Sequence, residues 1–416
     1  MIKDIIKLVG LLIATIYCLC QFTGCATTGS ATLDKTSFVT DLTSLTVSEN
    51  IQIVGLGEAS HGTSEFQQLK GEVFKALAVN NNCRIFAIEG DFGGCAKVNE
   101  YIHGGSGTAQ EAAAQIGFRI YRTQEMADII EWMRNYNKKA PVGEDLKFYG
   151  FDMQRYDNNK KHLFNYLTGN MPAIAQTYEL KLASLTDENM YSLDKTTLEQ
   201  AENDISELIL EMKTQKPSNP DAAVQFEYET AVEYAQCILE NTLLRGDSSD
   251  YDKMRDPFMA QKVEWIVQHE DGLIYINGHN GHIGKQSVSG FTCMGQLLDE
   301  QYNEAYFTIG TDAASTEFNA QDDESYKEFK VENQNVFTDQ LNGLDGNHYY
   351  LEFANVSQDK KWQKVLITQQ RMTALNVFFT NANTASKLFY TLKVTPAKCY
   401  NGLIVLRNTT PTHLLD

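Results

Sequence analysis

The chain has 416 residues, of which 43% are apolar and 21% charged. This composition supports a sizeable hydrophobic core and excludes a disordered, collagen-like or coiled-coil protein. The 35 Lys and Arg against 54 Asp and Glu give a formal net charge of −19, which argues against nucleic acid as the main partner.

The N-terminus has the features of an export signal. Residues 8–20 are almost wholly apolar, a length typical of a signal-peptide core and short of the roughly 20 residues that span a bilayer. The run from Phe22 to Cys25 then resembles the lipobox of bacterial lipoproteins, which implies cleavage before Cys25 and lipidation of its thiol. The alternative is an uncut signal anchor. We assign 1–24 to the signal and 25–40 to a tether, and we expect an exported protein anchored in the cell envelope through lipid on Cys25.

Strand and helix patterns alternate after this segment. Short apolar runs rich in β-branched and aromatic residues predict strands over 51–56, 84–88, 147–151, 273–276, 305–309 and 403–406. Apolar residues at helical spacing predict helices over 64–79, 123–139, 253–270 and 291–302. The alternation predicts an α/β fold with a mostly parallel central sheet flanked by helices.

Strand patterns disappear between residues 158 and 249. Long amphipathic stretches over 198–214 and 222–244 predict a helical insertion that packs over the sheet. Such an insertion forms the lid or wall of a pocket, or merely adds bulk. The α/β core is then assigned to residues 41–157 and 250–416.

Polar residues cluster where four of the predicted strands end. In open parallel sheets, ligand sites lie outside the carboxyl ends of the strands. The candidate residues at these ends are Glu58, His61, Glu89, Asp152, His279 and His282.

His61 follows the first strand in a glycine-flanked turn that opens a helix. A neutral imidazole there can take a proton from water, and Glu58 can hold its tautomer, as carboxylates do in catalytic triads. The structural alternative is an exposed imidazole beside a helix cap, with Glu58 a solvated loop acid.

Glu89 directly follows an apolar strand, so we expect it to be partly buried. Burial would raise its pKa and make it a proton donor or a second base. The alternative is a structural ion pair with an arginine. Asp91 and Asp152 are expected to be helix caps or loop acids.

His279 and His282 flank Asn280 in a turn after another strand. They are candidates to bind an oxyanion, donate a proton or ligate a metal, with Asn280 as a further oxyanion donor. Arg119 and Arg122 precede a helix and are candidates to bind substrate or an oxyanion, or else to have only a surface role.

Several chemistries lack their motifs. The sequence contains no GxSxG, GxxxxGK[ST], strand-linked GxGxxG or HExxH. The five cysteines beyond Cys25 match no zinc pattern, so we expect buried small hydrophobic residues, with one disulfide as the alternative; they are Cys83, Cys95, Cys237, Cys293 and Cys399.

The motifs together resemble those of the erythromycin esterase family. The matching segments are GEASHGTSEF (57–66), IEGD (88–91), WMRNYN (132–137), YGFDMQ (149–154), RDPFMA (255–260), GHNGHI (278–283) and MGQLL (294–298). The resemblance covers most of the chain from about residue 50 to 408, and it rests on the order and spacing of all segments together.

The resemblance implies an α/β core with a helical insertion and an active-site cleft between them, and hydrolysis of a cyclic ester without a metal or other cofactor. It implies that His61 is the general base, that Glu58 and Glu89 are its acidic partners, and that His279 and His282 form the second histidine motif. A small-molecule ester or lactone is then the expected substrate. A macrolide substrate, and with it antibiotic resistance, is less directly implied, because this chain has an export signal and an insertion without a recognisable motif.

Two other classes of function remain open from the sequence. One is a metal- or haem-binding exported protein on a related fold, since Glu and His on separate loops suit zinc or iron. The other is a non-catalytic surface binding protein that keeps the fold. The sequence does not define an oligomeric state.

Overall fold

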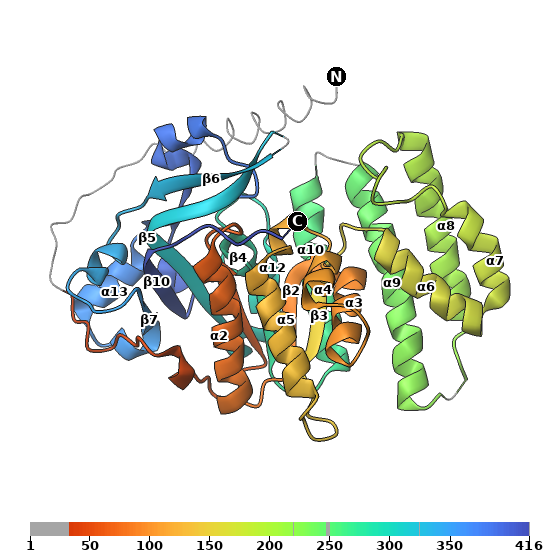
Figure 1. Cartoon of the computed structure of the whole chain (residues 1–416), viewed down its shortest axis with the longest axis horizontal. Coiled ribbons are helices and arrows are strands. Elements are labelled where there is room, and N and C mark those ends of the chain that lie inside the picture. The colour runs from red at the N-terminus through yellow and green to blue at the C-terminus, as the bar shows by residue number, and fades with distance from the viewer. Residues whose placement is uncertain (1–32, 219, 247–249, 324, 416) are drawn as a thin grey trace.

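The computed structural model describes residues 33–218, 220–246, 250–323 and 325–415. Within this part of the chain, helices cover both faces of a central sheet, and a separate block of helices lies beyond one end of it (Figure 1). The predicted signal peptide, including Cys25, lies outside the described residues.

The central sheet has the strand order β3-β2-β4-β1-β5-β10-β7. Its members are β1 (Ile53–Glu58), β2 (Ile85–Asp91), β3 (Lys147–Asp152), β4 (Ile274–His279), β5 (Tyr306–Asp322), β7 (His348–Glu352) and β10 (Gly402–Asn408). Every neighbouring pair is parallel except β10 with β7. The mostly parallel sheet predicted from the sequence is confirmed.

The two faces of the sheet bury different residues of the same strands. Ile85 of β2 belongs to one hydrophobic cluster and the next residue, Phe86, to another, because successive side chains of a strand point to opposite faces. On the Phe86 face lie α2 (Ser64–Asn80), α4 (Ala109–Gln115) and α5 (Gln124–Asn137). On the Ile85 face lie α10 (Tyr251–His269), α11 (Asn280–Ile283) and α12 (Met294–Tyr302). Helix α3 (Phe92–Ile102) contributes to both clusters.

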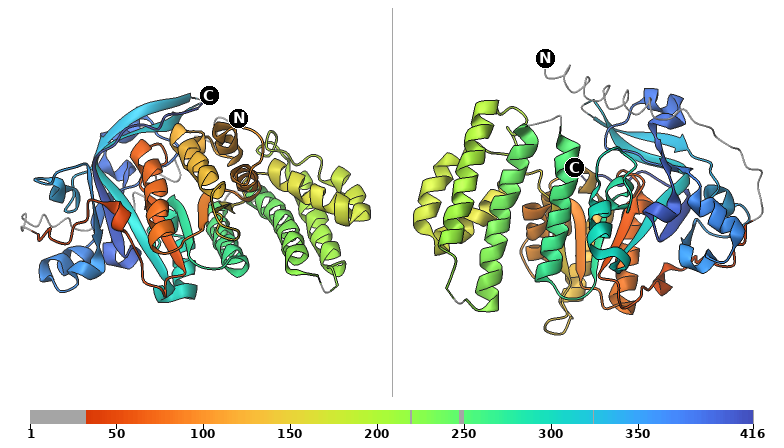
Figure 2. Two further views of the ribbon diagram at one scale, coloured as in Figure 1. Left: turned by 60° about the horizontal axis from the view of Figure 1, so that its bottom comes forward. Right: turned by 180° about the vertical axis from the view of Figure 1, so that it is seen from behind.

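The segment between β3 and α10 is helical. It contains α6 (Asp157–Asn170), α7 (Pro172–Lys181), α8 (Lys195–Thr214) and α9 (Ala222–Gly246). These helices stand side by side beyond α3 and α10 in all views, so they extend the molecule at the β3 end of the sheet (Figure 2). Their apolar residues join the cluster on the α10 face.

The other end of the molecule contains strands that the sequence analysis does not predict. They are β6 (Ser325–Glu332), which pairs antiparallel with the outer half of β5, the edge strand β7, and the hairpin of β8 (Gln370–Thr373) and β9 (Thr391–Val394). The strand predicted over 305–309 is also much shorter than β5, which continues to Asp322. Residues 310–322 are small or polar apart from Phe318, so they lack an apolar run, and pairing with β6 and β10 supplies the stability instead.

Short helices complete the core and this end of the molecule. They are α13 (Lys360–Ile367), α14 (Pro396–Cys399), η1 (Leu42–Ser44), η2 (Arg119–Tyr121), η3 (Asn303–Ala305), η4 (Thr338–Leu341), η5 (Phe353–Val356), η6 (Asn381–Ala385) and η7 (Lys387–Phe389). A third hydrophobic cluster, which includes Trp362 of α13, packs α13, α14, η4 and η5 on β7 and β10.

Residues 33–40, the described part of the predicted tether, are attached to this end. Leu33 is buried, the indole N–H of Trp362 donates to the carbonyl oxygen of Asp34, and Val39 pairs with Tyr350 of β7. Among the helices of the described residues, none has the length and apolarity to cross a membrane.

Candidate acid–base site

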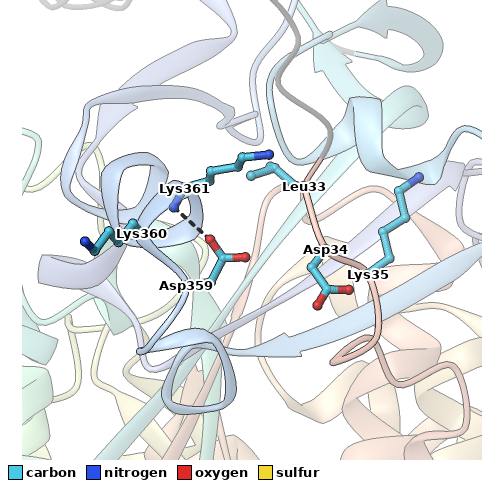
Figure 3. A pocket seen from close by; sticks show the side chains of 6 residues that line it. All are labelled: Leu33, Asp34, Lys35, Asp359, Lys360 and Lys361. Carbon is cyan, nitrogen blue, oxygen red and sulfur yellow. Dashed lines mark hydrogen bonds between the residues drawn. The ribbon is translucent and has the colours of Figure 1, made fainter.

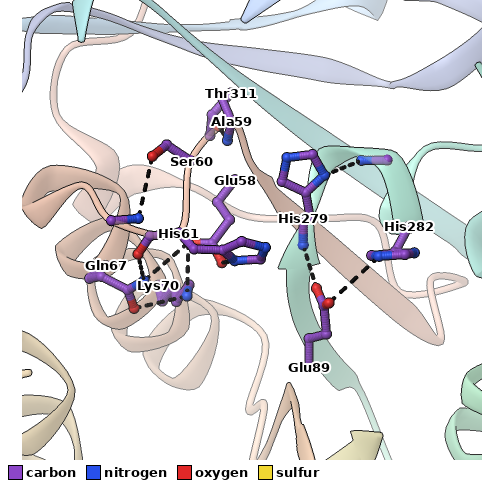
Figure 4. A network of polar contacts seen from close by, with 12 residues as sticks. Glu58, Ala59, Ser60, His61, Gln67, Lys70, Glu89, His279, His282 and Thr311 are labelled. Carbon is purple, nitrogen blue, oxygen red and sulfur yellow. Dashed lines mark hydrogen bonds and ion pairs between the residues drawn. The ribbon is translucent and has the colours of Figure 1, made fainter. Parts of the chain in front are cut away.

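Four parallel strands bring the candidate residues to one edge of the sheet. Strands β1, β3 and β4 end at Glu58, Asp152 and His279, and β2 continues through Glu89 to its end at Asp91. Residues at the ends of β1, β2 and β4 meet in the network of Figure 4, where His61 and His279 face each other. The sequence prediction that these loops converge is confirmed.

His61 is held by a buried carboxylate. Its Nδ1 lies 2.8 Å from Oε1 of Glu58, whose other oxygen is 2.9 Å from Nζ of Lys70. Burial alone would raise the pKa of Glu58, but Lys70 and His61 outweigh it and hold the pKa below its usual value. Glu58 is therefore an ionised acceptor, and the proton that it shares with His61 is on Nδ1 of the imidazole. In the neutral tautomer this arrangement leaves the lone pair of Nε2 free, as a general base requires.

Lys70 and Gln67 complete the support of this pair, and neither is among the residues predicted from the sequence. Lys70 is 1% exposed on α2, and its ammonium also donates to Oε1 of Gln67. The Gln67 amide donates to Glu58 and to the carbonyl oxygen of His61. A signal existed: Lys70 lies on the apolar stripe of α2, four residues after Phe66. A lysine on a buried helix face requires a charge partner.

His279 has the opposite tautomer. Its Nδ1 accepts from the backbone N–H of Gly281, and its ring centroid is 5.2 Å from that of His61. Burial lowers the pKa of His279 to about 3, and the neighbouring imidazoles of His61 and His282 lower it further when they are protonated. The ring is thus neutral with its proton on Nε2, and this buried Nε2 has no hydrogen-bond partner among the described residues. His279 offers an unused N–H beside the free lone pair of His61.

Glu89 is an ionised partner of an arginine. Its Oε1 lies 2.7 Å from Nη2 of Arg255 and its Oε2 accepts from the backbone N–H of His279. Burial favours a raised pKa, but His282 and Arg255 outweigh it and hold the pKa well below its usual value. The expectation of a raised pKa and a proton-donating Glu89 is therefore wrong, and the alternative of an arginine ion pair is confirmed.

His282 lies among carboxylates that favour its protonated form. Its Nδ1 is 2.9 Å from Oδ1 of Asp256, and its Nε2 lies 3.1 Å from Nη1 of Arg255 and 3.6 Å from Oε1 of Glu89. Burial opposes the charge, but Asp256 and Glu89 outweigh it and raise the pKa of His282. Neutral His282 accepts from Arg255, and protonated His282 faces Glu89, so this side chain is suited to exchange a proton.

Arg255 and Asp256 come from the first turns of α10, and the sequence analysis gives neither a role. Nη2 of Arg255 also lies 2.6 Å from Oδ2 of Asp152, so the guanidinium joins two strand ends. Asp152 is thus part of an ion-pair network and not the helix cap or loop acid expected. The sequence did contain a signal for these two residues, since the segment RDPFMA (255–260) places an Arg-Asp pair directly before a proline.

The remaining candidates are more peripheral. Asp91 caps α3 by accepting from the backbone N–H of Gly94, as expected. The amide of Asn280 is bonded at both ends to the backbone of Thr311, so it fixes the turn. Arg119 lies over the ring of Tyr326, and Nε of Arg122 has no hydrogen-bond partner among the described residues. Neither arginine forms an ion pair with a carboxylate of the described residues.

The structure also bears on metals and cysteines. No group of three or more His, Cys, Asp or Glu in the described part of the chain is arranged to hold a metal ion. The five described cysteines are buried and unpaired, which confirms their assignment as small hydrophobic residues. A surface hollow of about 560 Å³ lies between residues 33–35 and 359–361 (Figure 3) and shares no residue with the acid–base site.

Fold and site together define an α/β protein with acid–base side chains at the carboxyl edge of a parallel sheet. The chain belongs to the erythromycin esterase family, whose model matches residues 79–409. Glu58 and His61 precede the matched range.

Curated relatives are distant. The chain is 24% identical to erythromycin esterase type II of Escherichia coli over 62% of this chain and 68% of that one. It is 22% identical to the putative hydrolase YbfO of Bacillus subtilis, over 64% and 65% of the two chains. It is 20% identical to erythromycin esterase type I of E. coli, over 62% and 69%.

Solved structures share the fold. A Bacillus cereus protein superposes with a TM-score of 0.76 at 19% identity, covering 88% of this chain and 91% of that one. A mutant of the erythromycin esterase EreC in its open conformation gives a TM-score of 0.65 at 15% identity, covering 88% and 93%.

Proposed function

We propose that this protein hydrolyses a carboxylic ester, a lactone in particular, by attack of a water molecule that His61 activates, without requiring a metal ion. The observation that carries the proposal is the complementary pair of histidines. The Glu58 contact leaves His61 with a free Nε2 lone pair, and the facing His279 has a free Nε2–H. Ester hydrolysis needs one group of each kind.

In the first step, Nε2 of His61 takes a proton from water while the water oxygen bonds to the ester carbonyl carbon. The imidazolium that forms is stabilised by Glu58, which lies 2.8 Å from Nδ1. The carbonyl oxygen becomes an oxyanion, and the Nε2–H of His279 donates to it. A neutral imidazole suits this position, because its Nε2 keeps its proton throughout the reaction.

In the second step the C–O bond to the leaving group breaks, and the carbonyl re-forms. The leaving alkoxide needs a proton, and protonated His282 is suited to supply it. The proton that His61 gained then returns to solvent or to His282, which restores the starting state. Arg255 and Glu89 fix the position of His282 through the contacts described above.

A macrolide lactone is the first probe, because the named relatives of this chain include two erythromycin esterases. The chain starting at Leu33 is incubated with the lactone, with and without a chelator, and the product is analysed by mass spectrometry. We expect a product heavier by one water, at a rate that the chelator does not change. For a general base, His61→Ala should lower the rate by at least about 100-fold.

The matched control is His103→Ala. His103 also pairs with a carboxylate, Asp145 at 2.8 Å, but on the surface and outside the site, so the rate should not change. Loss of activity on chelation would favour a metal-dependent protein. If neither the macrolide nor a panel of simple esters and lactones is hydrolysed, the esterase proposal fails.

We further propose that the protein is an exported lipoprotein anchored through Cys25, as the sequence of residues 8–25 suggests. Expression of the full chain in a bacterium, followed by mass spectrometry of the membrane fraction, tests this. The expected product begins at Cys25 with a lipid mass, and Cys25→Ser should abolish the modification. An intact N-terminus in the wild type would contradict it.

A further inference from the structure

The loop that contains His61 is held by chain segments remote in sequence. The carbonyl oxygen of Gly62 accepts from the backbone N–H groups of Asn319, at 2.9 Å, and Thr412, at 3.1 Å. The backbone N–H of Ser64 donates to the carbonyl oxygen of Thr410. Both sides of Thr63, the second residue after His61, are therefore bonded to residues near 410.

Residues 409–415, here called the strap, run along this loop and continue to another. Pro411 pairs with Thr63 as an isolated antiparallel bridge, and Leu414 pairs with Thr123 in the same way. The backbone N–H of Leu415 donates to the carbonyl oxygen of Arg122 at 2.8 Å. The strap thus joins the His61 loop to the loop before α5.

Side chains fix the strap at three points. Asn319 of β5 donates from Nδ2 to the carbonyl oxygen of Thr412 at 2.7 Å. Glu65 of α2 accepts from the backbone N–H and the hydroxyl of Thr410. Glu125 of α5 is the third point.

Glu125 is 5% exposed and joins the strap directly to the helix that follows His61. Its Oε1 accepts from the Ser64 hydroxyl at 2.6 Å and from the backbone N–H of His413 at 3.1 Å. Ser64 is the first residue of α2, so the carboxylate couples the start of this helix to the strap.

From this geometry we propose that the strap is a positioning element, which holds His61 at the distance and angle that the acid–base reaction requires. The inference rests on the proposed function for its activity readout. Its physical basis is that backbone bonds on both sides of Thr63 leave the His61 loop little freedom. Misplacing a catalytic group by about 1 Å can cost roughly 100-fold in rate.

The test compares Glu125→Ala, Glu125→Gln and a chain that ends at Asn408. Glutamine keeps an acceptor oxygen for Ser64 and His413, and alanine does not. For the shortened chain we expect kcat to fall about 100-fold with KM changed less than about threefold. Glu125→Ala should lower kcat about tenfold, and Glu125→Gln should restore most of it. Glu131→Ala is the matched control, since Glu131 lies on the same helix and bonds Tyr101 instead.

A second readout needs no substrate. The proton between Nδ1 of His61 and Glu58 should give a downfield NMR signal, assigned by its absence in His61→Gln. We expect this signal to be lost or shifted in the shortened chain and in Glu125→Ala, and kept in Glu125→Gln and Glu131→Ala. If the wild type hydrolyses no ester, the proposed function fails while this signal still tests the strap.

Three results would overturn the positioning role. One is an unchanged kcat and NMR signal in the shortened chain. Another is a rise in KM alone, which would mean that the strap binds substrate. The third is a lower melting temperature with the His61 signal intact, which would mean that the strap only stabilises the fold.

Discussion

At the scale of single residues, three histidines of the same chemical type have three different surroundings. Ionised Glu58 accepts the proton on Nδ1 of His61. Burial keeps His279 neutral, and Asp256 with Glu89 favours the charged form of His282. The differences come from the neighbouring side chains, so replacing a neighbour should change the charge or the pKa of the groups at that histidine.

The first such neighbour is Lys70. Lys70→Met removes the only buried cation bonded to Glu58 in the described structure, so the pKa of Glu58 should rise. Breaking a buried pair on one side should lower the free energy of unfolding by about 3 kcal/mol, measured by urea denaturation. Lys97→Met, which breaks the surface pair with Glu100, should cost less than about 1 kcal/mol. Equal losses in both variants would contradict this account of Lys70.

The second neighbour is Asp256, which raises the pKa of His282 from one side while Glu89 does so from the other and Arg255 opposes them. Asp256→Asn keeps an acceptor for Nδ1 but removes the charge, so the pKa should fall. If His282 protonates the leaving group, activity is lost as pH rises through this pKa. The alkaline limb of the kcat profile should therefore move to lower pH. Asp145→Asn, beside surface His103, should leave the limb in place.

At the scale of elements, strand β5 sets the positions of loops from two other strands. The hydroxyl of Thr311 accepts from the backbone N–H of Ala59, and its backbone bonds both ends of the Asn280 amide. Farther along β5, the backbone N–H of Asn319 donates to the carbonyl oxygen of Gly62. A strand long enough to reach both loops fixes His61 relative to His279.

This close approach makes a prediction for Gly62. A Cβ at this position would lie 1.8 Å from the carbonyl oxygen of Asn319, so Gly62→Ala must push the His61 loop away from β5. We expect a loss of roughly 1–3 kcal/mol in unfolding free energy together with a large loss of kcat. Gly169→Ala on α6 meets nothing within 4 Å and should leave both measurements nearly unchanged. Full activity of Gly62→Ala would show that the contact with β5 is dispensable.

The sequence predicts the strands that carry the site, because each has a continuous apolar run followed by polar residues. That pattern places Glu58, Glu89 and His279 at one edge, since parallel strands end on the same side. It does not predict the outer half of β5, whose stability comes from pairing.

The proton states were less predictable than the positions. Burial of Glu89 suggested a raised pKa, and the opposite holds because Arg255 arrives from a helix 166 residues away. A sequence pattern reports burial along a strand, but not which charge another element brings to it. Lys70 was hidden for a related reason, since its partner Glu58 lies on a strand and not on its own helix.

At the scale of the whole molecule, buried neutral groups make stability depend on pH. Burial lowers the pKa of His279 to about 3 in the folded protein, against 6.5 for an unperturbed histidine. As pH falls below 6.5, the unfolded chain binds a proton that the folded protein does not, so stability decreases. Glu58 and Glu89 also make the protein less stable at low pH. Their pKa values are lowered in the folded protein, so the stability that they contribute is lost as pH falls through those values.

The contribution of His279 can be isolated. Between pH 7 and pH 5 its depressed pKa should cost the wild type about 2 kcal/mol of unfolding free energy. His279→Gln removes the titrating group, so the variant should lose about 2 kcal/mol less over the same interval. His103→Gln should follow the wild type. Parallel curves for the wild type and His279→Gln would show that His279 is not buried in its neutral form.

The strap also constrains when the site can form. Thr412 is synthesised 350 residues after Gly62, and only then can its N–H reach the loop beside His61. At about 5–20 residues per second, the interval is roughly 20–70 seconds of translation. A growing chain in which all acid–base residues up to His282 have been synthesised thus still lacks Thr412, one of the two backbone donors to the carbonyl oxygen of Gly62. On the proposed function, nascent chains should gain esterase activity abruptly, when residues 409–415 dock, and not in proportion to the length already made.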